Sequence, residues 1–284
     1  MIGRITKQIS NQYTVKTKSQ EYICTARGKF RNLNISPVVG DIVEFDDANL
    51  RINEIKPRIN ILSRPTVANI DYALIVTSLK KPDLSYTLLD KLITLVIANN
   101  IKPIIVLTKI DLISKSEFKE YIPAFKYYEA LYIPVIFNTK LKKLKKLLKG
   151  KTVVLAGQTG AGKSSLLNKL DKNLNIETKP ISEALNRGVH TTRHTEIYEI
   201  DNIYFVDTPG FSALDLSNLS PEEIKNTFRE FNKYTCEYQD CTHNNELGCG
   251  VKEALKKGSI LPSRYINYIR FLKEINENIS KLHK

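Results

Sequence analysis

Apolar and polar side chains alternate along about the first 60 residues of the chain, a pattern typical of β-strands with one buried face. Turn-forming or polar residues separate the alternating segments, which span residues 3–9, 12–17, 21–26, 40–45 and 50–55. So many short strands in so short a stretch predict a small barrel. An OB-fold is our leading interpretation, and an SH3-like barrel is the alternative.

From about residue 70 the pattern changes to α/β. Residues 68–78, 102–112 and 133–139 are apolar runs of strand length, whereas residues 84–100 repeat apolar side chains at helical spacing. Residues 114–117 (Ser-Lys-Ser-Glu) have the form of a capping box that begins a further helix. Strands that alternate with helices predict a mostly parallel sheet with helices on both faces.

Two later segments have the pattern of amphipathic helices. Residues 141–151 carry six lysines beside regularly spaced leucines, and we interpret these lysines as a solvated face. Residues 261–282 place a helical stripe of apolar side chains at Tyr265, Ile269, Leu272, Ile275, Ile279 and Leu282. We therefore predict three domains: a barrel (1–64), an α/β domain (65–213) and an appended α-helical domain (214–284).

The composition is that of a globular protein with an excess of positive charge. Hydrophobic residues make up 42% and charged residues 26% of the 284 positions, as in ordinary soluble domains. Apolar runs stay below 18 residues and the start lacks a signal-peptide core, so we expect a cytoplasmic protein. The net charge of +13 favours a polyanionic partner, although a merely basic surface is the alternative.

Residues 157–164 match the P-loop pattern G-x-x-x-x-G-K-[ST], with a strand-like segment before them and a helix-like segment after them. Such loops turn successive backbone N–H groups toward phosphate oxygens. We expect Lys163 to reach the β- and γ-phosphates and Ser164 to bind Mg²⁺. The residues predicted to contact the nucleotide here are Gly157, Gln158, Thr159, Gly160, Ala161, Gly162, Lys163, Ser164 and Ser165.

Residues 207–210 (Asp-Thr-Pro-Gly) follow another apolar strand-like segment. Asp207 at the strand end is suited to the Mg²⁺ shell, and Gly210 is suited to offer its N–H to the γ-phosphate. Alone this string predicts only a turn. Some forty residues after a P-loop, it is the partner that the P-loop requires.

Residues 108–111 (Thr-Lys-Ile-Asp) predict guanine recognition. A carboxylate such as Asp111 accepts from guanine N1–H and from the guanine amino group together, whereas adenine offers no such pair. Lys109 is expected to lie over the base and ribose, with residues 138–140 completing the pocket. The predicted base-side contacts are Thr108, Lys109, Ile110, Asp111, Asn138 and Thr139.

The order of these motifs is unusual. Base recognition comes first, then the phosphate loop, then a switch segment (residues 187–193), then residues 207–210. In familiar GTPases the base-reading motifs come last. A circular permutation explains the change of order, because each motif still occupies the end of its own strand.

The cysteines point to a metal site. Cys236, Cys241, His243 and Cys249 offer three thiolates and an imidazole within fourteen residues. In a reducing cytoplasm such a cluster favours metal over disulfides, and a Cys₃His set is typical of closed structural zinc. Free buried cysteines are the alternative here, and we expect the lone Cys24 to be structural.

Taken together, these motifs resemble the circularly permuted GTPases that act on the small ribosomal subunit, the RsgA/YjeQ group. The resemblance covers nearly the whole chain, from residues 26–45 through the nucleotide motifs to the Cys/His cluster. It implies an OB-fold, a permuted GTPase domain and a zinc-bearing C-terminal domain. It also implies binding to the 30S subunit, stimulation by that subunit and a role in its late maturation.

Departures from the family pattern affect the base pocket and the catalytic water. Thr108 stands where the family usually has Asn, and Asn138-Thr139 replaces a Ser-Ala pair, so we expect weaker GTP affinity. Phe211 stands where familiar GTPases orient water with Gln. The resemblance points to His190 as the substitute, with Thr192 sensing Mg²⁺ and the γ-phosphate. His190 as an ordinary loop residue is the alternative.

The expected partner is the 16S rRNA of the 30S subunit, bound by a monomer that uses GTP, Mg²⁺ and one structural Zn²⁺. In the barrel, Arg27, Lys29 and Arg31 flank Phe30. Cations around an aromatic ring suit nucleic acid, whereas a solvated loop anchored by Phe30 is the alternative. A nucleotide-gated RNA-binding or stress-sensing module, with incidental hydrolysis, is the competing function.

Overall fold

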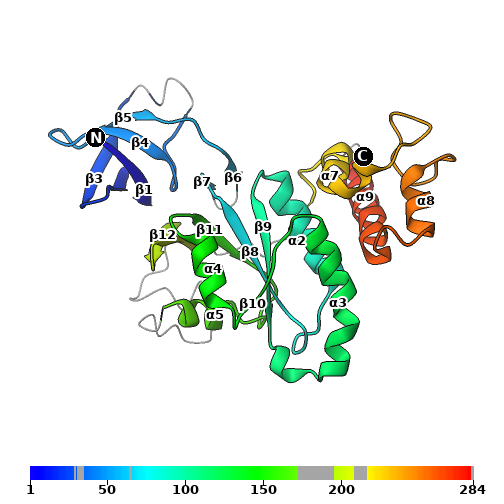
Figure 1. Cartoon of the computed structure of the whole chain (residues 1–284). Coiled ribbons are helices and arrows are strands. Elements are labelled where there is room, and N and C mark those ends of the chain that lie inside the picture. Colours follow the sequence, from blue (N-terminus) through cyan, green and yellow to red (C-terminus); the bar gives the residue numbers. More distant parts are fainter. Residues whose placement is uncertain (29, 31–34, 64–65, 172–194, 208–215, 283–284) are drawn as a thin grey trace.

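The N-terminal segments form a closed barrel in the computed structural model, which describes residues 1–28, 30, 35–63, 66–171, 195–207 and 216–282 (Figure 1). The barrel strands are β1 (Ile2–Ile9), β2 (Gln12–Lys16), β3 (Glu21–Ala26), β4 (Ile42–Asp46) and β5 (Arg51–Ile55). They pair in the order β1-β2-β3-β5-β4, and β4 returns to β1. Only the β3–β5 pair among them is parallel. This is the order of an OB-fold, so the leading interpretation is confirmed.

The barrel core decides between the two interpretations of its basic loop. Phe30 is 7% exposed and belongs to the hydrophobic core. Its ring therefore anchors the loop and is not an exposed stacking surface for a base. Arg27 is exposed, whereas Lys29 and Arg31 lie outside the described residues. Cys24 is fully buried, consistent with a structural role.

The central domain is a mostly parallel sheet that continues directly into the barrel. Its strands are β8 (Tyr72–Ser78), β9 (Lys102–Thr108), β10 (Val135–Phe137), β11 (Thr152–Ala156), β12 (Glu196–Ile200) and β13 (Ile203–Asp207). They run in the order β10-β9-β8-β11-β13-β12, and β12 is antiparallel to β13. Beyond β12 the sheet passes to β1 of the barrel. A small hairpin, β6 (Ile61–Ser63) and β7 (Thr66–Ala68), links the two domains along the chain.

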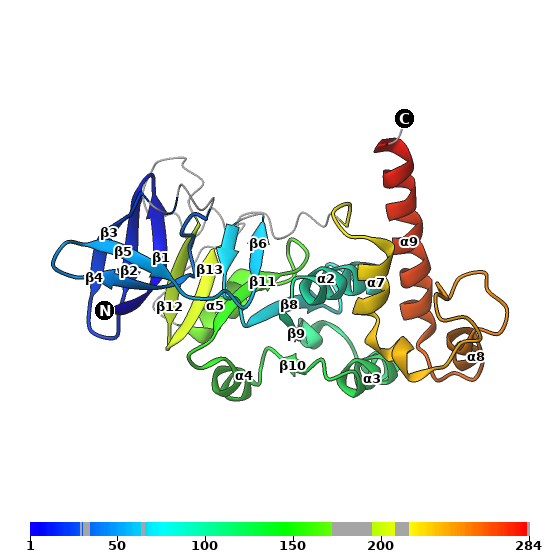
Figure 2. The same ribbon diagram turned by 90° about the horizontal axis from the view of Figure 1, so that it is seen from above.

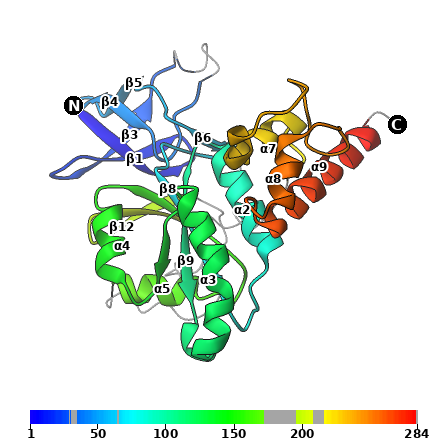
Figure 3. The ribbon, with the colours of Figure 1, turned by 45° about the vertical axis from the view of Figure 1, so that its right-hand side comes forward.

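Helices cover both faces of this sheet, as predicted (Figures 1 and 3). One face packs against α2 (Tyr86–Ala98) and α3 (Lys115–Ala130). The other packs against α4 (Leu141–Leu148) and α5 (Lys163–Leu170). The predicted capping box is present, because Ser114 and Glu117 exchange both hydrogen bonds at the start of α3.

Polar contacts fasten the barrel to the sheet. Lys7 forms an ion pair with Glu196 at 3.0 Å, and Lys16 forms one with Glu199 at 2.7 Å. Both carboxylates lie on β12, the strand that leads into the β13 hairpin. The barrel is therefore joined to the hairpin whose second strand ends at Asp207.

The C-terminal domain is a helical cluster at the opposite end of the molecule from the barrel (Figures 1 and 2). It comprises α7 (Pro221–Thr227), the 3₁₀ helix η2 (Arg229–Lys233), α8 (Gly250–Lys256) and α9 (Pro262–Leu282). Among the described residues, no helix is long and apolar enough to cross a membrane.

The described residues of the predicted apolar stripe on α9 all pack in or against the C-terminal core, so this part of the prediction is confirmed. Leu272 and Ile275 are buried, but Tyr265 and Ile269 are only partly covered, and the side chains of Ile279 and Leu282 lie outside the described part. The buried face of α9 is wider than the predicted stripe, because it also includes Arg264, Asn267, Tyr268 and Phe271. The polar residues Arg264 and Asn267 can be buried because they form hydrogen bonds with carboxylates of other elements.

A buried polar network joins this helix to the central domain. Arg264 donates to Asp90 of α2 at 2.9 Å and binds Glu230 of η2 through two bonds of 2.8 and 3.3 Å. Asp90 also accepts from Tyr128 at 2.7 Å and from Asn267 at 2.6 Å. Every charge in the network therefore has a partner, and the C-terminal domain is held against α2.

Candidate nucleotide and metal sites

The predicted nucleotide motifs gather at one edge of the sheet. Residues 108–111 follow β9, residues 138–140 follow β10, residues 157–164 follow β11, and Asp207 ends β13. These four strands are parallel through β8, so their carboxyl ends share one edge. After β8 the chain adds β9 and β10 on one side of β8, and it then adds β11 on the other side. Such a reversal of strand order is where α/β sheets bind nucleotides.

The P-loop has the backbone that phosphate binding needs. Gly157 has a φ of +132°, and a Cβ there would stand 2.1 Å from the Val76 carbonyl oxygen, so only glycine fits. Gly162 caps the start of α5, and Lys163 and Ser164 are the first residues of that helix. The positive end of α5 therefore faces the loop.

Lys163 is already turned into the loop. Its Nζ donates to the carbonyl oxygens of Gly157 at 2.6 Å and Gln158 at 2.9 Å. Burial lowers the pKa of Lys163. Burial disfavours the charged ammonium group, and the negative charge of a bound phosphate would stabilise it again. This fits the predicted role of Lys163 in phosphate binding.

Thr108 braces the P-loop. Its side chain is almost fully buried, and its hydroxyl donates to the Ala161 carbonyl at 2.6 Å. The same oxygen lies 3.3 Å from the Thr77 carbonyl. The hydroxyl thus ties the strand that ends at the base-reading segment to the phosphate-binding loop.

Replacing Thr108 with valine should weaken GTP binding roughly tenfold. Valine keeps the shape but leaves the buried Ala161 carbonyl without this donor, a loss of about 1–3 kcal/mol that loosens the loop. A titration with a fluorescent GTP analogue measures the change. Thr108→Ser retains the hydroxyl and should bind within a few-fold of wild type. Wild-type affinity in the valine variant would refute the bracing role.

The predicted base-reading segment lies at the end of β9. Lys109 adopts a left-handed backbone conformation with a φ of 54°, and its Nζ donates to the Lys81 carbonyl. Asp111 lies exposed in the short helix η1 (Ile110–Leu112). Asn138 follows β10, and its N–H donates to the Leu107 carbonyl at 2.9 Å. The structure therefore brings both predicted halves of the base pocket to neighbouring strand ends.

His190 and Thr192, predicted to be catalytic, lie outside the described residues. So do Gly210, predicted to contact the nucleotide, and Phe211. Asp207 is described as the last residue of β13, opposite Glu196 of β12. The backbone thus places it beside the P-loop strand β11, where an Mg²⁺ ligand is required.

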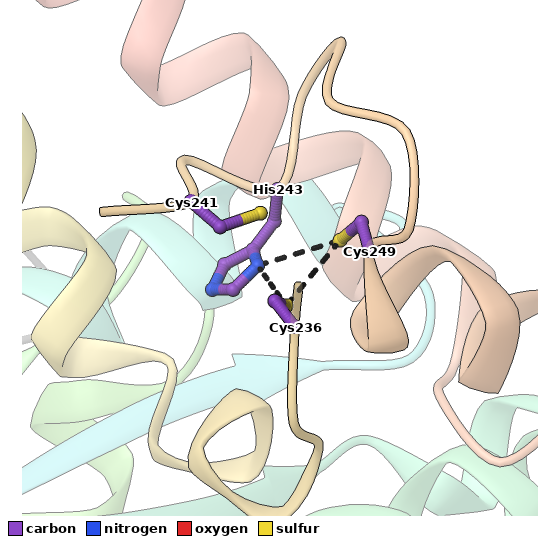
Figure 4. Close-up of side chains that lie close together, drawn as sticks. All are labelled: Cys236, Cys241, His243 and Cys249. Atoms are coloured by element: carbon purple, nitrogen blue, oxygen red, sulfur yellow. Dashed lines mark hydrogen bonds between the residues drawn. The ribbon is translucent and has the colours of Figure 1, made fainter. Parts of the chain in front are cut away.

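The predicted metal ligands converge in the C-terminal domain (Figure 4). The ligand atoms of Cys236, Cys241, His243 and Cys249 all lie within 4.8 Å of one another. Cys236 Sγ lies 3.8 Å from Cys249 Sγ, and His243 Nδ1 lies 3.5 Å from each of those sulfurs. Tetrahedral zinc, with Zn–S of about 2.3 Å and Zn–N of about 2.0–2.1 Å, requires S–S and S–N separations of about 3.8 and 3.5 Å. The residues therefore fit a closed zinc site.

The surroundings favour the metal-binding protonation state of His243 and Cys236 but oppose that of Cys241. Burial and the nearby Lys225 lower the pKa of His243, which keeps its imidazole neutral. Burial opposes ionisation of Cys236, but backbone N–H groups of Val251 and Gly250 lower its pKa overall. Burial raises the pKa of Cys241 to about 12. A bound cation would therefore have to displace the proton of Cys241.

Two tyrosines of α9 hold the ligand loop. Tyr265 OH donates to the His243 carbonyl at 2.7 Å, and Tyr268 OH donates to the Thr242 carbonyl at 2.6 Å. Their sequence signal was weak, because tyrosines at helical spacing read as ordinary core residues. The metal loop and the helix that contacts α2 are thus one packed unit.

The strand order and the motifs at its carboxyl edge define a P-loop GTPase whose motifs are circularly permuted. The family model "RsgA GTPase" matches residues 55–217, and "RsgA N-terminal domain" matches residues 2–53. The chain belongs to the RsgA GTPase family.

Similar proteins span nearly the whole chain. "Small ribosomal subunit biogenesis GTPase RsgA" of Clostridium novyi is 45% identical over 282 residues, which covers 97% of both chains. "RsgA 2" of Oceanobacillus iheyensis is 43% identical, over 96% of this chain and 97% of that one. The crystal structure of YjeQ from Thermotoga maritima has a TM-score of 0.83 at 33% identity, over 96% of this chain and 98% of that chain. YloQ, described as a circularly permuted GTPase, has a TM-score of 0.81 at 34% identity, over 97% and 95%.

Proposed function

We propose that this GTPase binds the 30S ribosomal subunit and assists its late maturation, with hydrolysis of GTP to GDP and phosphate that the subunit stimulates. The observation that carries the proposal is the attachment of two further domains to one GTPase domain: an OB-fold joined to strand β12 and a Cys₃His helical domain held against α2. Relatives that match nearly the whole chain at 43–45% identity are named small ribosomal subunit biogenesis GTPases. The net charge of +13 suits a partner rich in rRNA.

We further propose that the protein acts as a cytoplasmic monomer with the domain limits expected from the sequence, 1–64, 65–213 and 214–284. GTP would lie on the P-loop, with its base between residues 108–111 and 138–139. Mg²⁺ would neutralise phosphate charge beside Ser164, Thr192 and Asp207. Zinc, held by the Cys₃His set, would be structural.

GTP turnover with 30S subunits, with 50S subunits and without ribosomes tests the function. We expect slow basal turnover and a clear rise with 30S only, because the proposed stimulation requires the subunit to position the water-orienting group. Equal turnover under all three conditions, together with 30S binding, would favour the competing RNA-binding or stress-sensing module. Absence of 30S binding would reject the proposal altogether.

Asp111→Asn should shift the preference from GTP toward xanthosine triphosphate by about 100-fold. The new amide can donate where xanthine presents a carbonyl, whereas it leaves a guanine donor unmatched. Competition between the two nucleotides in a binding assay measures the ratio. An unchanged preference for GTP would show that residues 108–111 do not read the base.

His190→Ala should lower 30S-stimulated turnover by about 100-fold while GTP binding persists. With Phe211 in the place of the usual Gln, another group must orient the water, and such a group typically contributes 100-fold or more. Lys163→Ala should instead impair binding itself, which separates chemistry from affinity. Near-normal stimulated turnover in the His190 variant would assign the water-orienting role to another residue or to the ribosome.

A further inference from the structure

A cleft of about 640 Å³ lies between the central domain and the C-terminal helices. Tyr72 and Lys102 contribute to it from the first residues of β8 and β9, and Pro134 from the residue before β10. These positions mark the amino edge of the parallel sheet, opposite the nucleotide edge. Arg229 and Lys233 of η2 line the other wall. None of the described nucleotide or zinc residues lines this cleft.

The charge of the cleft is positive. Lys102, Arg229 and Lys233 are exposed and form no ion pair with any residue that the structure describes. The lining carboxylate, Glu230, is bound by Arg264 through two hydrogen bonds and is nearly buried. Lys102 Nζ also lies over the Tyr72 ring, 6.0 Å from its centroid. The three cations therefore lack a carboxylate partner among the described residues, and the lining carboxylate is already neutralised, which favours an anionic partner.

An aromatic side chain stands at the rim. Tyr132 lines the cleft and is 94% exposed, so its ring is almost entirely in solvent. Its backbone has a φ of 61°, a conformation that costs energy for a bulky residue. Hydrogen bonds from the N–H groups of Tyr132 to Glu129 and of Ile133 to Tyr128, at 3.0 and 3.1 Å, hold the turn. The fold thus fixes the backbone that carries this exposed ring, and the ring lines the same cleft as the three cations.

We propose that this cleft binds a single-stranded segment of RNA, with a base stacked on Tyr132 and neighbouring phosphates at Lys102, Arg229 and Lys233. Stacking rings combined with free cations are the features by which proteins hold unpaired nucleic acid. An acidic peptide would use the cations but would not need the exposed ring. The inference rests on the proposed function, because the small subunit is the source of the RNA.

The cleft is formed before binding. Arg264 lies in its floor and links Glu230 of one wall to Asp90 of the central domain. Because these groups are buried and paired, the two walls keep their separation without a ligand. Preorganisation of this kind reduces the entropy that binding must overcome.

Salt dependence of 30S binding tests the cations. The triple variant Lys102→Gln, Arg229→Gln, Lys233→Gln should bind 30S about tenfold or more weakly and lower the slope of log affinity against log salt by about two. The matched control, Lys115→Gln, Lys119→Gln, Lys126→Gln, removes the same charge from exposed positions of α3 that do not line the cleft. It should retain most of the affinity. Equal losses in both variants, or none in the first, would overturn the proposal.

Photo-crosslinking tests the ring. Tyr132→Ala should weaken 30S binding roughly tenfold, because a stacked base would be lost. In a separate experiment, p-benzoylphenylalanine placed at position 132 should crosslink to 16S rRNA. Crosslinks to a ribosomal protein, or none, would overturn the RNA assignment.

Basal GTP turnover should be unchanged in all these variants, since the cleft is remote from the nucleotide edge. Failure of the wild type to bind 30S would reject the proposed function, whereas normal wild-type binding with unaffected variants would reject the cleft alone.

Discussion

Removal of zinc is expected to unfold the C-terminal helices. Cys241 and Cys249 belong to the hydrophobic core of this domain, and the ligand loop is bound to α9 by Tyr265 and Tyr268. Structural zinc contributes about 10–16 kcal/mol of apparent binding free energy at pH 7. The binding free energy of zinc is therefore comparable to the whole stability of a typical domain, which is about 5–15 kcal/mol. Hydrogen exchange of α7–α9 after chelation should therefore become fast, while the barrel stays protected.

Paired cysteine variants provide the control for zinc removal. Cys241→Ala should lose the metal and the protection of α9, because a ligand is missing. Cys24→Ala makes the same change in the barrel core, remote from the cluster, and should keep one zinc per chain. A chelated protein with an unchanged melting curve and unchanged 30S affinity would refute a structural role for zinc.

Local patterns were sufficient for most of the fold. Alternation over five short segments predicted the barrel strands to within about two residues, and the capping box at Ser114 located the start of α3. Each nucleotide motif is continuous in sequence and follows its own strand, so a change in motif order did not obscure it. The zinc ligands were recognisable because their chemistry is rare and their spacing is short.

Contacts between distant segments could not be predicted in this way. Thr108 is 53 positions from Ala161, whose carbonyl accepts its hydrogen bond. From the sequence, the replacement of Asn by Thr at this position suggested only a weaker contact with the base. Phe30 looked like a candidate stacking ring until the barrel core enclosed it. The burial of Arg264 and Asn267 on α9 was missed, because these residues count as polar unless their partners are known. Those partners are 34 to 177 positions away.

Arg264→Met should destabilise the C-terminal domain by about 3–5 kcal/mol, because it leaves two buried carboxylates without their cation. Asp90 and Glu230 are 0% and 4% exposed, so solvent cannot replace the lost guanidinium. The Arg264 guanidinium also lies 4.1 Å above the Phe228 ring. Hydrogen exchange of α9 in the zinc-loaded protein measures the loss, and Arg270→Met is the control. Arg270 lies exposed on the same helix with one hydrogen bond to Thr87, so its loss should cost less than about 1 kcal/mol.

A second substitution separates the effect of charge from that of packing. Adding Glu230→Gln to Arg264→Met removes one of the two unpaired charges without restoring the lost side chain. If uncompensated charge is the cause, the double variant should recover part of the stability lost in the single one. If the loss reflects packing alone, the double variant should be no more stable. Equal protection of α9 in wild type and Arg264→Met would contradict the network as the joint between the C-terminal domain and α2, and with it the preformed floor of the cleft.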